Sequence, residues 1–163
     1  SQKSTTKENY LLCPHGKHSS MSFFIELIKS ILSDKKRNVT LFASSFEDLK
    51  ICRHLTSLFN LKVIKGWLDI AESNKAICQA DFVISTRLHP SVVAASYGTP
   101  FLMISYEEKQ KEFLSSIGCS DRLFIESDEL INALYINDIK RGITSGVEYW
   151  HKRYPDFINV FGS

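Results

Sequence analysis

Several features that would assign this chain of 163 residues to a common functional class are scarce or absent. Lysine and arginine number 20 against 18 aspartates and glutamates, and no long basic run occurs, so composition gives no reason to propose a nucleic-acid partner. No apolar stretch approaches the roughly eighteen residues that span a bilayer, and the start of the chain shows no signal-peptide pattern. We therefore expect a cytoplasmic protein without a membrane-spanning helix.

Motifs that hold metals or phosphates are also missing. The four cysteines, at positions 13, 52, 78 and 119, lie far apart without a C-x-x-C pair, which disfavours a compact zinc site or redox pair. We expect reduced thiols. The first apolar run leads into CPHGKHSS and not into G-x-G-x-x-G, and no P-loop occurs, so a dinucleotide is disfavoured. That loop also lacks the carboxylates that a phosphoacceptor receiver needs.

The chain does contain enough apolar side chain for one packed domain, since 44% of its residues are hydrophobic and 12% are aromatic. We interpret residues 1–9 as a flexible lead or linker, residues 10–141 as a Rossmann-like domain and residues 142–163 as a C-terminal helical segment. Short apolar runs predict strands at 10–13, 38–43, 61–64, 82–84, 99–104 and 122–125. Helical patterns alternate with them. This order predicts an α/β fold with a doubly wound, mainly parallel sheet of about six strands and helices on both faces.

Residues suited to helix ends support this alternation. Capping residues precede four of the helical patterns: Ser19 or Ser20, Ser45 with Asp48, Asp69 with Glu72, and Ser127. A helix of about two turns is framed by Pro90 near its start and Gly98 past its end, and the helix expected at 107–117 is ended by Gly118.

Most of the candidate chemistry lies between residues 80 and 109. The loop of residues 85–89 opens at the carboxyl end of the sheet, where the free N–H groups of the following helix attract anions. Arg87 adds a guanidinium suited to carboxylate or phosphate, and His89 adds a proton near neutral pH. Lys109 leaves the same edge after the next strand, so we expect it to approach both. An anion is then expected in this pocket.

Each of these residues also has a purely structural interpretation. Arg87 can pair with a neighbouring carbonyl or carboxylate, His89 can cap a helix, and Lys109 can face solvent. His15, Lys17 and His18, in the loop after the first strand, can grip a diphosphate or sugar or form only a polar turn. As zinc ligands they lack a fourth partner at sensible spacing.

Three short motifs, taken in order, resemble the polysaccharide pyruvyl transferases. They are R-L-H at residues 87–89, G-T-P at 98–100 and Y-E-E-K at 106–109, and the resemblance is strongest over residues 81–118. It implies a GT-B-like protein of two Rossmann-like domains, with this chain as the C-terminal half and a missing N-terminal domain as its partner. It also implies transfer of a pyruvyl group from phosphoenolpyruvate to a sugar of a cell-surface polysaccharide, which forms a ketal.

The resemblance further implies residue roles. Arg87, His89 and Lys109 would be catalytic, with His89 the preferred general acid or base and Arg87 and Lys109 binding phosphoenolpyruvate. Substrate contacts would also come from the following residues: Leu88, Tyr106, His15 and Lys17. No metal and no cofactor are implied, and a lipid-linked acceptor would bring the protein to the inner face of the membrane.

Two other classes of function remain open at this stage. A GT-B glycosyltransferase half would bind a nucleotide sugar, often with a carboxylate near the end of the domain that contacts the ribose. Glu126 and Asp128 are available for this contact. A non-catalytic binding module would keep the fold without the chemistry. Binding of phosphoenolpyruvate, of a nucleotide sugar or of neither discriminates among the three.

Overall fold

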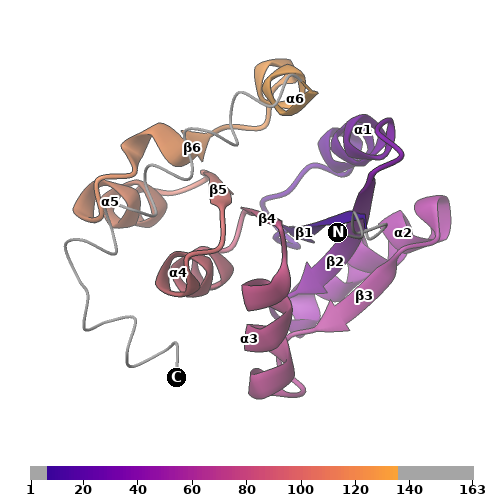
Figure 1. Ribbon diagram of the computed structural model, residues 1–163, viewed down its shortest axis with the longest axis horizontal. Coiled ribbons are helices and arrows are strands. Elements are labelled where there is room, and N and C mark those ends of the chain that lie inside the picture. Colours follow the sequence, from indigo (N-terminus) through magenta and orange to yellow (C-terminus); the bar gives the residue numbers. More distant parts are fainter. Residues whose placement is uncertain (1–6, 136–163) are drawn as a thin grey trace, which may run out of the picture.

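The computed structural model describes residues 7–135, and over this range six parallel strands form one sheet. The strands are β1 (Glu8–Cys13), β2 (Arg37–Ala43), β3 (Lys62–Lys65), β4 (Phe82–Ser85), β5 (Phe101–Ile104) and β6 (Leu123–Phe124). Their order in the sheet is β3-β2-β1-β4-β5-β6 (Figure 1). The predicted doubly wound sheet of about six strands is confirmed. The order reverses between β1 and β4, which is where such folds bind ligands.

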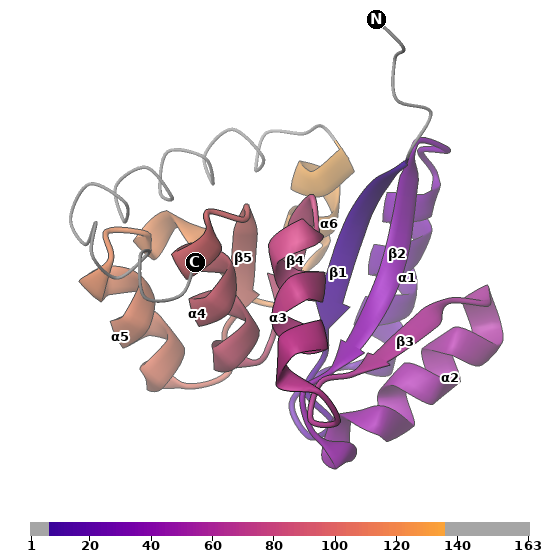
Figure 2. The same ribbon diagram turned by 60° about the horizontal axis from the view of Figure 1, so that its bottom comes forward.

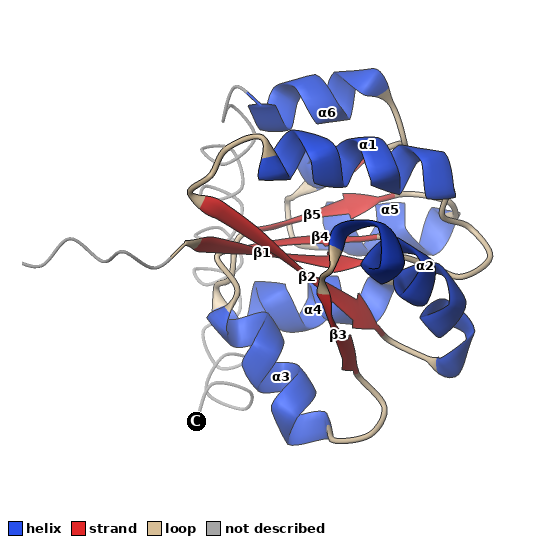
Figure 3. Ribbon diagram, turned by 90° about the vertical axis from the view of Figure 1, so that its right-hand side faces the viewer, coloured by secondary structure: helices blue, strands red, loops and turns tan. Residues whose placement is uncertain are grey.

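Helices cover both faces of the sheet (Figure 3). One face packs against α1 (Met21–Leu32), α2 (Leu49–Phe59) and α6 (Asp128–Tyr135). The other packs against α3 (Ile70–Gln79), α4 (Leu88–Tyr97) and α5 (Glu108–Ser116). Two short 3-10 turns, η1 (Phe46–Asp48) and η2 (Ser120–Arg122), complete the described elements.

The central strand β1 contributes to both cores. Tyr10 and Leu12 belong to the core under α1, whereas Leu11 and Cys13 belong to the core over α4. All four are buried, because side chains alternate between the faces of a strand and both faces are covered. This explains why the strand appears in the sequence as an unbroken apolar run.

Helix ends follow the expected capping chemistry. The Ser20 hydroxyl accepts from Phe23 N at 3.4 Å, and the Asp69 carboxylate accepts from Glu72 N at 3.2 Å. Gly98 and Gly118 have φ of 76° and 70°, the left-handed conformation that glycine adopts without steric penalty.

Several element boundaries differ from those expected, and three of these differences have a structural cause. β1 begins at Glu8, because Glu8 N donates to Lys36 O at 2.8 Å and extends the ladder through two polar residues. α4 has ten residues instead of about two turns, since it begins at Leu88 with Arg87 in the capping position. Ser45 and Asp48 do form a capping box, but it opens the 3-10 turn η1 before α2.

The expected C-terminal helical segment, the last six residues of the expected domain and residues 1–6 of the lead lie outside the described residues. Among the helices of residues 7–135, none is long and apolar enough to cross a membrane.

Candidate functional site

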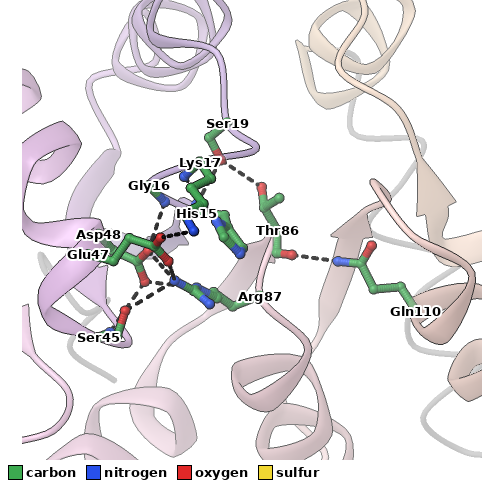
Figure 4. A network of polar contacts seen from close by, with 10 residues as sticks. All are labelled: His15, Gly16, Lys17, Ser19, Ser45, Glu47, Asp48, Thr86, Arg87 and Gln110. Atoms are coloured by element: carbon green, nitrogen blue, oxygen red, sulfur yellow. Dashed lines mark hydrogen bonds and ion pairs between the residues drawn. The ribbon is translucent and has the colours of Figure 1, made fainter.

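Four loops meet at the carboxyl edge of the sheet. They follow β1, β2, β4 and β5, and Figure 2 shows β1, β2 and β3 running towards the end of the sheet where these loops lie. Figure 4 shows that residues of the loops after β1, β2 and β4, together with Gln110 of α5, form one network of polar contacts. The switch point between β1 and β4 lies in the middle of this edge.

Asp48 is the centre of that network. Its side chain is fully buried, and it accepts hydrogen bonds from Gly16 N at 2.8 Å and from Ser45 N at 3.3 Å. It also accepts two bonds from Arg87, from Nε at 3.0 Å and from Nη2 at 2.6 Å. One carboxylate therefore ties together the loops after β1, β2 and β4.

Arg87 is correspondingly paired. Besides Asp48, its Nη2 donates to Glu47 Oε2 at 2.8 Å and to Ser45 Oγ at 3.1 Å, and the side chain is 21% exposed. Burial opposes the charge, but the hydrogen bond and charge of Asp48, then of Glu47, outweigh it and raise the pKa of Arg87. The guanidinium is thus held in place by internal carboxylates, and that it also binds an anion stays a prediction.

The charges of this group balance. Lys17 lies 3.4 Å from Glu47, so two cations face two carboxylates. The hydrogen bond from Arg87 is the main cause that lowers the pKa of Glu47. We call Lys17, Ser45, Glu47, Asp48 and Arg87 the Arg87 cluster.

Three aromatic rings join the loop after β1 to the loop after β5. His18 stacks on Tyr106 with ring centroids 4.0 Å apart, and His15 meets both rings edge-on, at 4.5 and 4.9 Å. His15 is buried, and its Nδ1 accepts from Lys17 N at 3.1 Å, which places the ring proton of the neutral form on Nε2. Burial, and then the charge of Arg87, lower the pKa of His15.

Of the predicted site residues, the structure thus brings His15, Lys17, Arg87 and Tyr106 together. Leu88 packs against the core over α4. His89 and Lys109 are exposed, each the second residue of a helix, and neither side chain makes a hydrogen bond or ion pair with another described residue. The roles predicted for all seven stay predictions.

The N-terminus of α4 lacks a side-chain cap, since Arg87 occupies the capping position without accepting a hydrogen bond there. Within residues 7–135, no side chain accepts from Leu88 N or His89 N, the N–H groups that the first turn offers besides Pro90, which has none. Uncapped N–H groups of this kind are what an anion site requires.

Gln110 fixes the loop after β4 against the loop after β5. Its buried amide donates to the carbonyls of Thr86 and Ile104 and accepts from Tyr106 N at 2.8 Å and Glu107 N at 3.4 Å. Nothing local in the sequence signals this bridge, because Gln110 and Thr86 are 24 residues apart.

Sequence comparison places this geometry in a family. The model of the polysaccharide pyruvyl transferase family matches residues 7–108, which include the R-L-H motif and Tyr106 and end one residue before Lys109. The chain belongs to the polysaccharide pyruvyl transferase family. No curated protein matches it.

Two solved structures share the fold of this pyruvyl transferase family member. The glycotransferase of kitacinnamycin is 14% identical, with a TM-score of 0.62, over 99% of this chain and 42% of its own. A mutant O-GlcNAc transferase of Thermobaculum terrenum is 12% identical, with a TM-score of 0.59, over 96% of this chain and 34% of its own. These likenesses show the fold alone, which is Rossmann-like and like one half of a GT-B protein, and the chain spans less than half of either.

A cation could use ligand atoms of His15, Glu47 and Asp48, which lie within 4.8 Å of one another. Arg87 already occupies both carboxylates, however, so a metal would have to displace its guanidinium. Cys13, at the end of β1, is fully buried, and burial raises the pKa of its thiol well above the usual value. It is a core residue and not a nucleophile.

Glu126, considered from the sequence, borders the loop after β1, whereas a polar hollow lies apart from the four loops. Glu126 Oε1 accepts from Ser20 N at 2.8 Å, next to the start of α1, and burial raises the pKa of this carboxyl. A hollow of about 410 Å³ lies under α3 and holds none of the Arg87 cluster. We therefore place the candidate site at the four loops.

Proposed function

We propose that this chain contributes the phosphoenolpyruvate-binding part of a pyruvyl transferase that acts on a sugar of a polysaccharide or its lipid-linked precursor. The observation that carries this proposal is the location of the family motif. R-L-H lies at the switch point of the sheet and opens a helix whose first turn has no side-chain cap.

The transfer has a balanced form. A proton is added to the methylene carbon of phosphoenolpyruvate, and a sugar hydroxyl adds to the adjacent carbon and loses its proton. A second hydroxyl of the sugar then displaces inorganic phosphate, which leaves a cyclic ketal. The reaction needs a proton donor, an acceptor for the hydroxyl protons and a site for the departing phosphate.

We assign the phosphate to the first turn of α4, where N–H groups and the helix dipole favour an anion. The Nε and Nη2 atoms of Arg87 donate to the carboxylates of Asp48 and Glu47. We propose that the remaining nitrogen, Nη1, faces phosphoenolpyruvate. The Arg87 cluster carries no net charge, so we propose that additional positive charge comes from Lys109 at the start of α5.

His89 is the proposed general acid and base. It is exposed one residue into α4, beside the proposed phosphate position. Replacing it by alanine in the intact enzyme should lower kcat by about 100-fold to 10,000-fold, the range for a positioned acid or base. Phosphate release in the presence of a glycan acceptor measures this.

His54, exposed on α2, supplies the matched control, because His54→Ala removes a histidine outside the site. An enzyme with His89→Ala that works as fast as the His54→Ala enzyme would exclude His89 from the mechanism. Circular dichroism on both variants separates loss of chemistry from loss of fold.

A glycosyltransferase half is the second candidate, because the solved structures of similar fold are glycosyltransferases. Thermal unfolding separates the two. We expect phosphoenolpyruvate to raise Tm, by an amount that grows with its concentration, and UDP-glucose to leave it unchanged. A shift with UDP-glucose alone would favour the glycosyltransferase, and a shift with neither would favour a non-catalytic module.

A further inference from the structure

An exposed aromatic pair lies beside the Arg87 cluster. Phe46, the first residue of η1, is 76% exposed, and Trp67, in the turn between β3 and α3, is 36% exposed. Their rings meet edge to face, with centroids 6.2 Å apart. Both rings therefore project from loops at the same edge of the sheet as the candidate site.

The turn that carries Trp67 is fixed at both ends. Gly66 N donates to Ala43 O at 2.8 Å, which ties the turn to the end of β2. The Ser73 hydroxyl donates to Gly66 O at 2.6 Å, and Asp69 caps α3. A surface that is ordered before its ligand arrives loses little entropy on binding.

The pair is continuous with the Arg87 cluster. Phe46 lies between Ser45 and Glu47 in the chain, and both of these bond Arg87 Nη2. The exposed Phe46 ring and the Glu47 carboxylate, which is 36% exposed, therefore come from adjacent residues of η1.

We propose that Phe46 and Trp67 form a stacking platform for a pyranose ring of the acceptor glycan. The platform rests on the proposed function, in which the acceptor is a polysaccharide. A pyranose has a face of C–H groups, which pack on the electron-rich face of an aromatic ring, and a rim of hydroxyls, which donate to a carboxylate such as Glu47.

Two further exposed apolar side chains, Leu68 and Ile70, follow Trp67 and widen the surface. A membrane fits this surface less well than a glycan does. Glu47 and Asp69 lie among the apolar residues, and anionic lipids repel their carboxylates. The combination of aromatic faces and carboxylates instead matches a neutral, hydroxyl-rich ligand.

Saturation-transfer NMR on the 163-residue chain tests the platform. The probes are the methyl pyranosides of glucose, galactose, mannose and N-acetylglucosamine, with the aromatic protons of the protein irradiated. We expect at least one glycoside to receive saturation, most strongly on the C–H groups of a single face. Phe46→Ala and Trp67→Ala should each weaken its affinity by about 2-fold to 10-fold, the effect of losing one aromatic contact.

Leu58→Ala is the matched control, since Leu58 is 53% exposed on α2 but lies outside the loops. It should leave the saturation transfer unchanged. Trp67→Phe keeps an aromatic ring, so it should retain more of the signal than Trp67→Ala. Circular dichroism confirms that each variant is folded.

Several results would overturn the platform: no transfer to any of the four glycosides, equal loss in the Leu58→Ala chain, or Trp67-dependent binding to phosphatidylcholine vesicles without glycoside binding. Titration with phosphoenolpyruvate separates this proposal from the proposed function. Phe46→Ala should bind phosphoenolpyruvate normally. If phosphoenolpyruvate fails to bind any chain while glycosides still bind at Phe46, the proposed function fails and the glycan site stands.

Discussion

Asp48 is the residue that should matter most for the integrity of the site, because its buried carboxylate holds three loops and one guanidinium. Asp48→Asn keeps the shape but removes the charge that pairs with Arg87. We expect the free energy of unfolding to fall by about 1–3 kcal/mol, the cost of leaving a buried polar partner unsatisfied. Urea denaturation followed by circular dichroism measures it.

Glu47→Gln is the control for this prediction. Glu47 also bonds Arg87 but lies at the surface, where water replaces the lost ion pair. Its removal should leave stability within error of the unmodified chain. Equal losses in the two variants would show that burial of Asp48 is not what matters.

His15 should make stability depend on pH. Its pKa is lowered in the folded protein, so between the ordinary pKa of about 6.5 and the lower folded value the unfolded chain binds a proton that the folded chain does not. Stability should therefore fall as the pH is lowered through this interval. His15→Asn keeps an acceptor for Lys17 N and should make the free energy of unfolding less dependent on pH in this interval.

Urea titrations at several pH values between 7.5 and 5 test this prediction, with His54→Asn on α2 as the control that keeps the slope of the unmodified chain. The nitrogen chemical shifts of His15 give the titration directly. A His15 ring that titrates above the ordinary value would reverse the sign and contradict the structure.

At the scale of the elements, the loop after β1 lies unusually close to η1. A Cβ placed on Gly16 would collide with the backbone carbonyl of Glu47. Gly16→Ala should separate the two loops, weaken the bond from Gly16 N to Asp48 and lower stability by about 1–3 kcal/mol, as overpacking does. Urea denaturation checks this, and Lys17→Ala, an exposed neighbour in the same loop, should have little effect. A fully stable Gly16→Ala chain would show that the loop can relax.

The elements themselves could be predicted because their signals are local. Buried parallel strands are apolar runs, and caps such as Asp69 and the positive-φ Gly98 act within a few residues of the helix they limit. The same locality explains the errors. The loop expected at residues 85–89 ends at Arg87, which occupies the N-cap position of α4, and its partner Asp48 is 39 residues away.

The site was therefore predictable only in part. Parallel strands end at one edge of a sheet, so the predicted parallel sheet already indicates that the loops after β1, β4 and β5 share an edge. The strand order that places the switch point between β1 and β4 comes from the structure. Asp48 and Gln110 gave no such signal, because Asp48 is interpreted from the sequence as part of a helix cap and Gln110 lies 24 residues from the Thr86 carbonyl that it bonds. Which carboxylate a cation contacts depends on side-chain packing across several loops, and no local pattern records that.

At the scale of the whole molecule, the two cores share four strands, β1, β2, β4 and β5. Leu11 and Leu12 are neighbours on β1, both fully buried, yet they pack on opposite faces of the sheet. β1 also pairs with both of its neighbours, β2 and β4. Loss of either core should therefore remove the support of the other, and the described domain should unfold as one unit.

Leu11→Ala and Leu12→Ala form a matched pair that tests this cooperativity. Each removes the same side chain from a different core, and each should lower the free energy of unfolding by about 2–5 kcal/mol, the usual result of a buried leucine truncated to alanine. Both variants should show a single urea transition, with the same midpoint by far-ultraviolet and near-ultraviolet circular dichroism. The free energy of unfolding should also depend on urea concentration with the same slope in both variants, because the same surface is exposed on unfolding. If Leu11→Ala instead released the layer of α3, α4 and α5 in a separate, earlier transition, the two helical layers would be independent units. The R-L-H motif, which opens α4, would then belong to a layer that can open by itself.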